Sequence, residues 1–170
     1  TELILRESKR IVRMLDGVII SETHNGFNCA NAGIDASNIP GSEEVCLLPV
    51  DPDASARGIV SAIKKRLGIT VPVVISDTFG RPWRNGAVNV AIGVAGLNPM
   101  LSYVGEEDSF GNMMYTTTIA VADEIAAAAE LVTGKVLEIP VALIKGYGYV
   151  LMYDASHDSL IRSPDKDLFR

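Results

Sequence analysis

An apolar stretch that ends in a carboxylate places the strongest constraint on the fold of this chain. Residues 71–77, VPVVISD, have the β-branched content of a buried strand, and a loop with two glycines and two arginines follows Thr78. A carboxylate is costly to bury unless it is paired or bound to a metal. Many α/β proteins bind their ligands at the carboxyl ends of strands. We therefore expect Asp77 to mark a site at a sheet edge.

Further segments carry the patterns of helices and strands. The helices are predicted over 2–15, over 53–68 with Asp53 as its N-cap and Gly68 at its end, and over 122–134. The strands are predicted over 17–23, 27–35, 114–121 and 140–149, with a tight turn at Asn25-Gly26, and 89–97 is a glycine-spaced apolar run. Strands and helices do not alternate regularly. The sequence therefore predicts one α+β domain over 1–170 with mixed or antiparallel sheets, packed helices and a polar tail over 154–170.

Composition and charge argue against several classes of protein. The core of the 170 residues must be aliphatic, because 48% of the residues are apolar and only 6% are aromatic. A net charge of -6 argues against a nucleic-acid partner, and no apolar run has the length of a membrane span. Cys29 and Cys46 are the only cysteines in the sequence, so one disulfide is possible. Such a small number of cysteines favours a protein of a reducing compartment. Cys29, Cys46, His24 and His157 do not have the spacing of zinc ligands. We expect a cytoplasmic protein without nucleic-acid or membrane partners.

The segment NAGIDASN is the first of three candidate clusters. It crowds Asn31, Asp35, Ser37 and Asn38 into one turn. One interpretation is a turn whose side chains bond to their own backbone. The other is a hard-cation site, since magnesium and manganese prefer carboxylate and amide oxygens. The residues alone leave both open.

The second cluster is SDTFGRPWRNG. Asp77 and the hydroxyl of Thr78 have the chemistry to hold one cation, while Arg81 and Arg84 have the chemistry to contact phosphate oxygens. The alternative is that Asp77 pairs with one of these arginines and that Trp83 packs in the core. Both interpretations stay open.

The third cluster, TGKVLEIP at 133–140, places Lys135 just past a predicted helix end. From spacing alone, a helix cap with a favourable cation near the carboxyl terminus is the simpler interpretation. Asp123 and Glu124 likewise suit the start of the helix over 122–134.

Several motifs in this order resemble one family. They are CANAGIDASN, LLPVDPDASA, SDTFGRPWRNG, AIGVAG and VADEIAAAAELV. Together they resemble the γ-glutamyl ligases of coenzyme F420 biosynthesis, from about Glu22 to the end of the chain. The DPDASA and TGK segments are most similar to the bacterial branch, whose members are often fused to a flavin-dependent reductase domain that has no counterpart in this sequence.

The resemblance implies an unusual α+β fold that forms extensive dimers. It implies a GTP-dependent ligase that joins L-glutamate by an amide bond to a deazaflavin precursor of the coenzyme and releases GDP and phosphate. Manganese or magnesium would be the metal, with potassium as a stimulating ion. We expect an acyl phosphate intermediate, with positioning and electrostatics supplying most of the rate. The expected partners are the deazaflavin precursor, GTP, L-glutamate and a second copy of the chain.

The resemblance also implies roles for individual residues. Those that match family positions are Asp35, Asp77 and Thr78 for the metal, and Asn38 with Thr133, Gly134 and Lys135 of the loop over 133–140 for the nucleotide. In archaeal members a glutamine follows the glycine of that loop and contacts a second metal. Because Lys135 stands there in this chain, the second metal site stays open. Arg81 and Arg84 as phosphate contacts follow from their chemistry and not from the resemblance.

One departure from the family pattern bears on activity. Family members carry roughly a further half-domain before the point that matches Thr1, with a loop that contacts GTP. We therefore expect this chain to hold the metal half of the site. Three interpretations stay open: a GTP-dependent ligase or its core, a non-catalytic deazaflavin- or nucleotide-binding module or fragment, and a metal-dependent phosphohydrolase.

Overall fold

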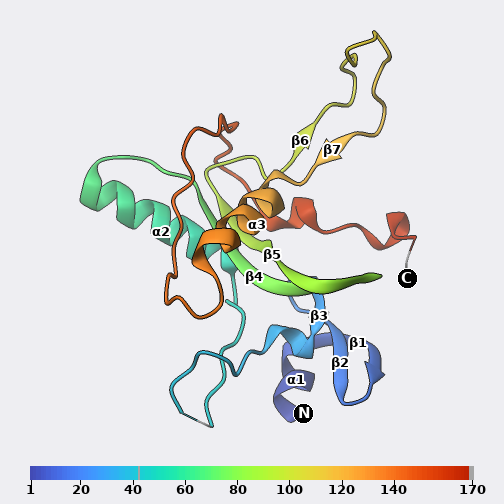
Figure 1. The fold of residues 1–170 in the computed structure, drawn as a ribbon, viewed down its shortest axis with the longest axis vertical. Helices are drawn as coiled ribbons and strands as arrows, with labels where there is room; N and C mark the ends of the chain where they lie inside the picture. The colour runs from blue at the N-terminus through green and yellow to red at the C-terminus, as the bar shows by residue number, and fades with distance from the viewer. Residues whose placement is uncertain (42, 169–170) are drawn as a thin grey trace.

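The computed structural model describes residues 1–41 and 43–168 and confirms the predicted α+β class (Figure 1). Its α-helices are α1 (Glu2–Glu7), α2 (Pro52–Leu67) and α3 (Val121–Thr133). Its 3-10 helices are η1 (Asn31–Gly33), η2 (His157–Leu160) and η3 (Pro164–Lys166). Its strands are β1 (Ser8–Leu15), β2 (Val18–Thr23), β3 (Asn28–Ala30), β4 (Val73–Arg81), β5 (Arg84–Ala95), β6 (Leu101–Ser102) and β7 (Thr118–Ile119).

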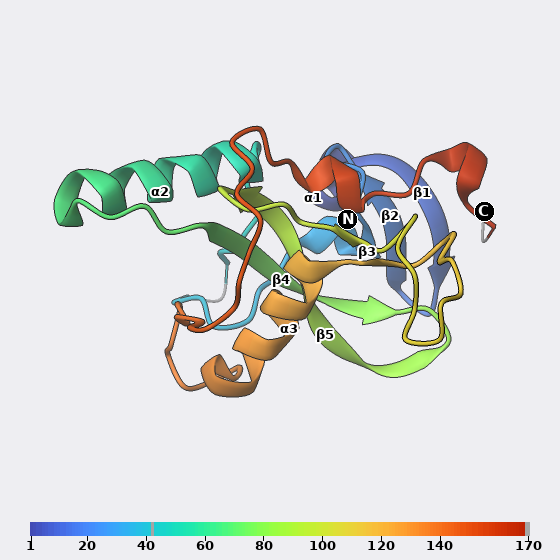
Figure 2. The same ribbon diagram turned by 90° about the horizontal axis from the view of Figure 1, so that it is seen from above.

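The strands form small antiparallel sheets around one long hairpin. The pairings are β1-β2-β3, β4-β5 and β6-β7. In Figure 1 the β6–β7 hairpin projects away at one end of the molecule, and the β1–β3 sheet lies toward the other. Helices α2 and α3 lie on either side of the β4–β5 hairpin (Figure 2). Small side chains from β5 and α3, among them Ala91, Val94 and Ala122, form the central core and allow close packing.

The amino-terminal segment differs from the helix predicted over 2–15. The helix ends at Glu7, and β1 pairs with β2 across a turn at Asp16 and Gly17, whose φ angles are 50° and 83°. An Asp-Gly pair with positive φ at both residues is a strong signal for a tight hairpin. The apolar residues of 2–15 therefore belong to two elements.

Several predicted strands are shorter than expected. The strand predicted over 27–35 covers only 28–30 before η1, and the one over 114–121 covers only Thr118–Ile119. The segment 140–149 contains no strand within the described residues. A strand is stabilised by backbone pairing with a neighbour, and none of the described strands pairs with that segment. None of the described helices combines the length and apolar character that crossing a membrane requires.

Helix α2 is capped by Asp51 and not by Asp53. The Asp51 carboxylate accepts a hydrogen bond from the backbone N–H of Ala54 at 2.7 Å, and Pro52 begins the helix. Gly68 ends it in the left-handed conformation with φ 71°, as predicted. The prediction chose the wrong aspartate because both precede the same apolar pattern, and only the backbone geometry separates cap from first turn.

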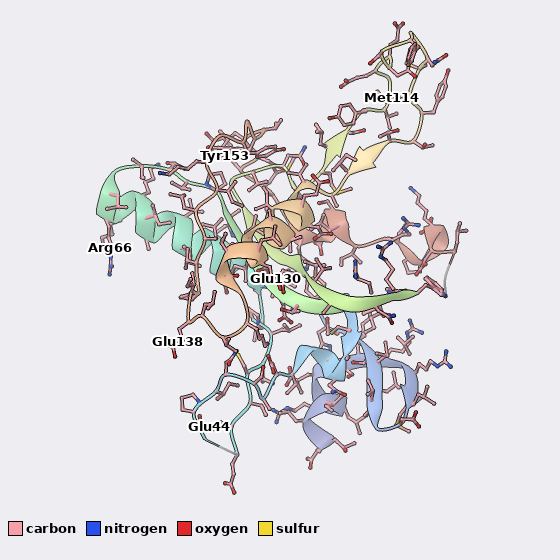
Figure 3. The ribbon with its side chains drawn as sticks, in the orientation of Figure 1. Glu44, Arg66, Met114, Glu130, Glu138 and Tyr153 are labelled. Carbon is pink, nitrogen blue, oxygen red and sulfur yellow. The ribbon has the colours of Figure 1, made fainter. Side chains whose placement is uncertain are left out.

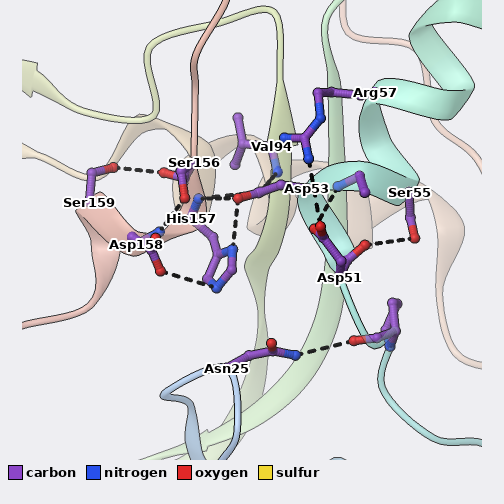
Figure 4. A network of polar contacts seen from close by, with 12 residues as sticks. Asn25, Asp51, Asp53, Ser55, Arg57, Val94, Ser156, His157, Asp158 and Ser159 are labelled. Carbon is purple, nitrogen blue, oxygen red and sulfur yellow. Dashed lines mark hydrogen bonds and ion pairs between the residues drawn. The ribbon is translucent and has the colours of Figure 1, made fainter.

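Asp53 instead joins three distant segments through a buried polar network (Figure 4). Its carboxylate accepts hydrogen bonds from the backbone N–H of Val94 at 2.7 Å and of His157 at 3.1 Å, and it lies 3.0 Å from His157 Nδ1. Asp53 and His157 are only 5% and 7% exposed. The start of the predicted polar tail is therefore packed against α2 and β5.

Gly93 allows β5 to approach the first turn of α2. A Cβ atom at this position would lie 2.5 Å from the carbonyl oxygen of Pro52, which is too close for real atoms. We expect Gly93→Ala to lower the free energy of unfolding by about 1–3 kcal/mol, because backbone must move to admit the methyl group. Urea unfolding followed by circular dichroism would measure this.

Gly58 supplies the matched control for that substitution. It lies within α2, and a Cβ atom there would meet nothing within 4 Å. Gly58→Ala should therefore raise the free energy of unfolding by roughly 0.5–1 kcal/mol through helix propensity. Equal effects of the two substitutions would contradict the packing explanation.

Candidate functional site

Strand β4 does not end at Asp77, as the sequence predicted, but continues to Arg81. Strand β5 begins at Arg84, so the expected ligand loop is a hairpin whose strands pair along their length. Successive side chains of a strand point to opposite faces. Asp77 is half-buried, whereas Thr78 is exposed and its hydroxyl donates to Asn89 Oδ1 at 2.7 Å. Asp77 and Thr78 therefore project from opposite faces of β4.

Asp35 is held by both its backbone and its side chain. Its backbone N–H and C=O bond to Cys46 in an isolated antiparallel bridge. Its carboxylate accepts hydrogen bonds of 2.7 Å from the hydroxyl and the backbone N–H of Ser37. These bonds from Ser37 and the nearby ammonium of Lys135 lower the pKa of Asp35 to about 2. The turn is thus self-bonded, as one interpretation held, and it also presents an ionised carboxylate.

Lys135 connects this turn to the loop that follows α3. Its Nζ lies 3.1 Å from Asp35 Oδ2, and its backbone carbonyl accepts a hydrogen bond of 2.7 Å from Asn38 Nδ2. These contacts join residues about a hundred positions apart in the chain. Figure 3 labels Glu138 on the loop after α3 and Glu44 on the loop before α2, and both loops lie on the same side of the molecule. The first and third clusters of the sequence therefore form one site.

Asp77 interacts electrostatically with Asp35 and Lys135. Burial raises its pKa above the ordinary aspartate value, and the negative charge of Asp35 adds to this, while a backbone hydrogen bond at Thr78 and the charge of Lys135 act in the opposite direction. The buried Cys29 thiol is also close enough to feel Asp77, and burial together with that carboxylate raises the pKa of Cys29 to about 11. A cation beside Asp35 and Asp77 would relieve the repulsion between them.

A cavity of about 580 Å³ lies between the two joined loops. It is lined by Asn38, Ile39, Pro40, Gly134, Lys135, Val136, Glu138, Ile139 and Pro140. Its walls combine apolar side chains with an amide, a carboxylate and an ammonium group, the mixture usual for small-molecule sites. Of the positions matched to nucleotide binding, Asn38, Gly134 and Lys135 thus line one cavity, and Thr133 is not part of its lining.

Comparison with known proteins decides the family. The family model for F420-0:Gamma-glutamyl ligase matches residues 1–146. The chain belongs to this family. The match begins at residue 1, upstream of Glu22, from which the resemblance was expected to run.

Curated relatives of the F420-0:gamma-glutamyl ligase family match nearly the whole chain. Coenzyme F420:L-glutamate ligase of Methanothermobacter thermautotrophicus is 47% identical over 171 residues, which cover 99% of this chain and 68% of that protein. The proteins of the same name from Methanocaldococcus jannaschii and Methanopyrus kandleri are 44% and 41% identical, with 99% of this chain and 67% and 68% of those proteins covered. The chain thus spans about two thirds of their length. The expected likeness to the bacterial branch stays a prediction.

The residues expected from the γ-glutamyl ligase resemblance are only partly brought together. Asp35, Asn38 and Lys135 are joined by direct contacts, and Asp77 interacts electrostatically with Asp35 and Lys135. Thr133 is the last residue of α3, and Gly134 caps the helix and lines the cavity. Their roles toward metal and nucleotide stay predictions.

The two arginines lie apart from this group. Arg81 is four residues beyond Asp77, which corresponds to about 13 Å along a strand. Its Nη2 donates to the carbonyl of Asn85 within the hairpin turn at 2.7 Å. Within the described part of the chain, neither Arg81 nor Arg84 forms an ion pair with Asp77, and Trp83 is 80% exposed, so the alternative for this cluster is wrong. Phosphate binding by the arginines stays a prediction.

Sequence reasoning missed the pairing of Asp53 with His157 and the closeness of Cys29 to Asp77. No local pattern indicates either, because 104 residues separate the first pair. Both cysteines are free thiols, with Cys29 buried and Cys46 exposed. The single disulfide left open by the sequence is therefore not formed.

The donor set near the cavity suits a hard divalent cation only in part. Asp35 and Asp77 supply carboxylate oxygens, which such cations prefer. The described residues contain no group of three His, Cys, Asp or Glu side chains arranged around one point. A bound cation would therefore take its remaining ligands from backbone carbonyls, water or a substrate phosphate.

Proposed function

We propose that this chain is the core of a GTP-dependent ligase that adds L-glutamate to the deazaflavin precursor of coenzyme F420. The proposal rests on family membership together with one structural observation: Asp35, Asn38 and Lys135 meet beside a cavity large enough for part of a nucleotide. Relatives at 41–47% identity carry the name coenzyme F420:L-glutamate ligase.

The reaction proceeds by activation of a carboxylate. An oxygen of the precursor's terminal carboxylate attacks the γ-phosphorus of GTP, and the bond from that phosphorus to the β-γ bridging oxygen breaks, which yields an acyl phosphate and GDP. The amine of L-glutamate, after loss of a proton, attacks the acyl carbon and displaces phosphate. An amide bond forms, and GDP and phosphate leave.

The chain's own residues bind and orient the charged groups in this scheme. Asp35 and Asp77 would hold manganese or magnesium, which supplies charge neutralisation for the triphosphate when bound. Asn38 and the loop over 134–140 line the cavity in which the nucleotide would lie, and Lys135 brings a positive charge to its wall. Arg81 and Arg84 lie along the β4–β5 hairpin away from Asp77. They would contact a phosphate group only if the bound substrate extends along β4 toward them. Potassium is proposed as a stimulating ion.

We further propose that the active form is a homodimer. The segment 136–153 carries exposed apolar side chains, among them Val136 and Val141, each 77% exposed, and Tyr153, 85% exposed. An exposed apolar stretch of this length favours a protein partner. Size-exclusion chromatography with light scattering would test this.

Mass spectrometry of the deazaflavin tests the proposed reaction. After incubation of the chain with precursor, GTP, manganese, potassium and L-glutamate, we expect a product heavier by one glutamyl unit. The same mixture without GTP is the control and should leave the precursor unchanged. Tight binding of GDP or deazaflavin by folded protein without turnover would instead indicate a non-catalytic module, and GTP hydrolysis indifferent to L-glutamate would indicate a phosphohydrolase.

A further inference from the structure

Lys135 supplies a positive charge next to Asp35 in this structure. Its Nζ lies 3.1 Å from Asp35 Oδ2, and the two side chains are 59% and 47% exposed. The contact is therefore an exposed ion pair on Asp35, one of the two carboxylates that we assign to the metal.

An ion pair of this kind is weak enough to exchange. Pairs between exposed side chains contribute about 0–1 kcal/mol because water screens the attraction and two side chains lose freedom. A divalent cation carries twice the charge of the ammonium and gains direct carboxylate coordination. Such a cation and Lys135 Nζ compete for Oδ2 of Asp35.

The ammonium group of Lys135 also has a second binding position available, at the wall of the cavity. Lys135 lines the 580 Å³ cavity together with Asn38 and the loop over 134–140. Its backbone is anchored because its carbonyl accepts the hydrogen bond from Asn38 Nδ2. Displacement from Asp35 therefore moves the flexible side chain and leaves the loop in place, so the ammonium remains at the cavity wall. Ammonium groups bind phosphate oxygens as point charges.

We propose that Lys135 is an exchangeable counter-ion: a divalent cation displaces its ammonium from Asp35, and the freed ammonium then binds an anionic phosphate in the adjoining cavity. Cation and nucleotide binding are thereby coupled through one side chain. This inference rests on the metal and nucleotide assignments of the proposed function.

The first test is a manganese titration of the chain without nucleotide, followed by electron paramagnetic resonance of free Mn²⁺. Lys135→Gln should bind Mn²⁺ roughly two- to fivefold more tightly than the unchanged chain, because the competing charge is gone. Lys135→Arg should retain the competition. Lys145→Gln is the matched control, since Lys145 is exposed and outside the cavity lining, and it makes the same change in net charge.

The second test measures GDP affinity with Mn²⁺ and with a chelator. Because Asp35 holds the ammonium in the absence of metal, Lys135→Gln should weaken GDP binding by about twofold or less with chelator and by about tenfold with Mn²⁺. Direct chelation of Mn²⁺ by GDP is common to both proteins and cancels in this comparison.

The outcomes separate this inference from the proposed function. If Asp35→Asn abolishes Mn²⁺ binding but Lys135→Gln behaves like Lys145→Gln, the exchange is overturned and the metal assignment stands. If Asp35→Asn leaves Mn²⁺ binding unchanged, both are overturned. An equal loss of GDP affinity with Mn²⁺ and with chelator overturns the coupling.

Discussion

Asp53→Ala should lower the free energy of unfolding by about 3–5 kcal/mol, the largest stability effect expected for a single substitution in this chain. The carboxylate is 5% exposed and accepts bonds from Val94 and His157, so its removal leaves buried donors without their acceptor. Those donors belong to β5 and to the segment that follows residue 153. Chemical unfolding followed by fluorescence or circular dichroism would measure the loss.

Asp51→Ala is the matched control for Asp53→Ala. Asp51 lies two residues away and caps the same helix, but its side chain is 60% exposed. Loss of an N-cap costs about 1 kcal/mol. A loss at Asp53 no larger than that at Asp51 would contradict the role assigned to the buried network.

The effect of Asp53 should depend on pH in one direction. Burial opposes ionisation of this carboxyl, but hydrogen bonds from Val94, Ser156 and His157 outweigh it, so the pKa of Asp53 lies below the ordinary value. A lowered folded-state pKa stabilises the protein above the unfolded value of about 3.9, and that contribution is lost as the pH falls through the folded value. The difference between the unchanged chain and Asp53→Ala should therefore shrink in acid below about pH 4.

Asp77→Asn should reduce glutamyl transfer at least about a hundredfold, the largest activity effect we expect. Asparagine has nearly the same shape but lacks the charge that holds a divalent cation. Initial rates of product formation at saturating GTP and manganese, measured in the form of the protein that shows transfer, would test this. A parallel Mn²⁺ titration should show weaker binding by the variant.

Asp123→Asn is the control for Asp77→Asn, because it removes the same charge from a carboxylate of similar burial. Asp123 is half-buried and burial raises its pKa, as it does that of Asp77, but its carboxylate accepts a hydrogen bond from the backbone N–H of Ala91 within the core. This variant should keep its rate per folded molecule. An unchanged rate for Asp77→Asn would remove Asp77 from the metal site.

Local patterns in the sequence predicted the elements whose signals lie within a few residues. The apolar periodicity and closing glycine of α2, the alanine-rich α3 and the Asn-Gly turn before β3 all appear where expected. The Asp16-Gly17 turn also carried a local signal, which the amphipathic pattern over 2–15 obscured. Helices and tight turns are set by contacts close in sequence, and so local reasoning finds them.

The sequence by itself also indicated the family, through the motifs around Asp35, Asp77 and Lys135. Only the tertiary structure decided which of these residues meet. It joins Lys135 to Asp35, turns Thr78 to the face of β4 opposite Asp77, and pairs Asp53 with His157. Contacts across about a hundred residues depend on strand pairing and packing of the whole chain, which no window of sequence contains.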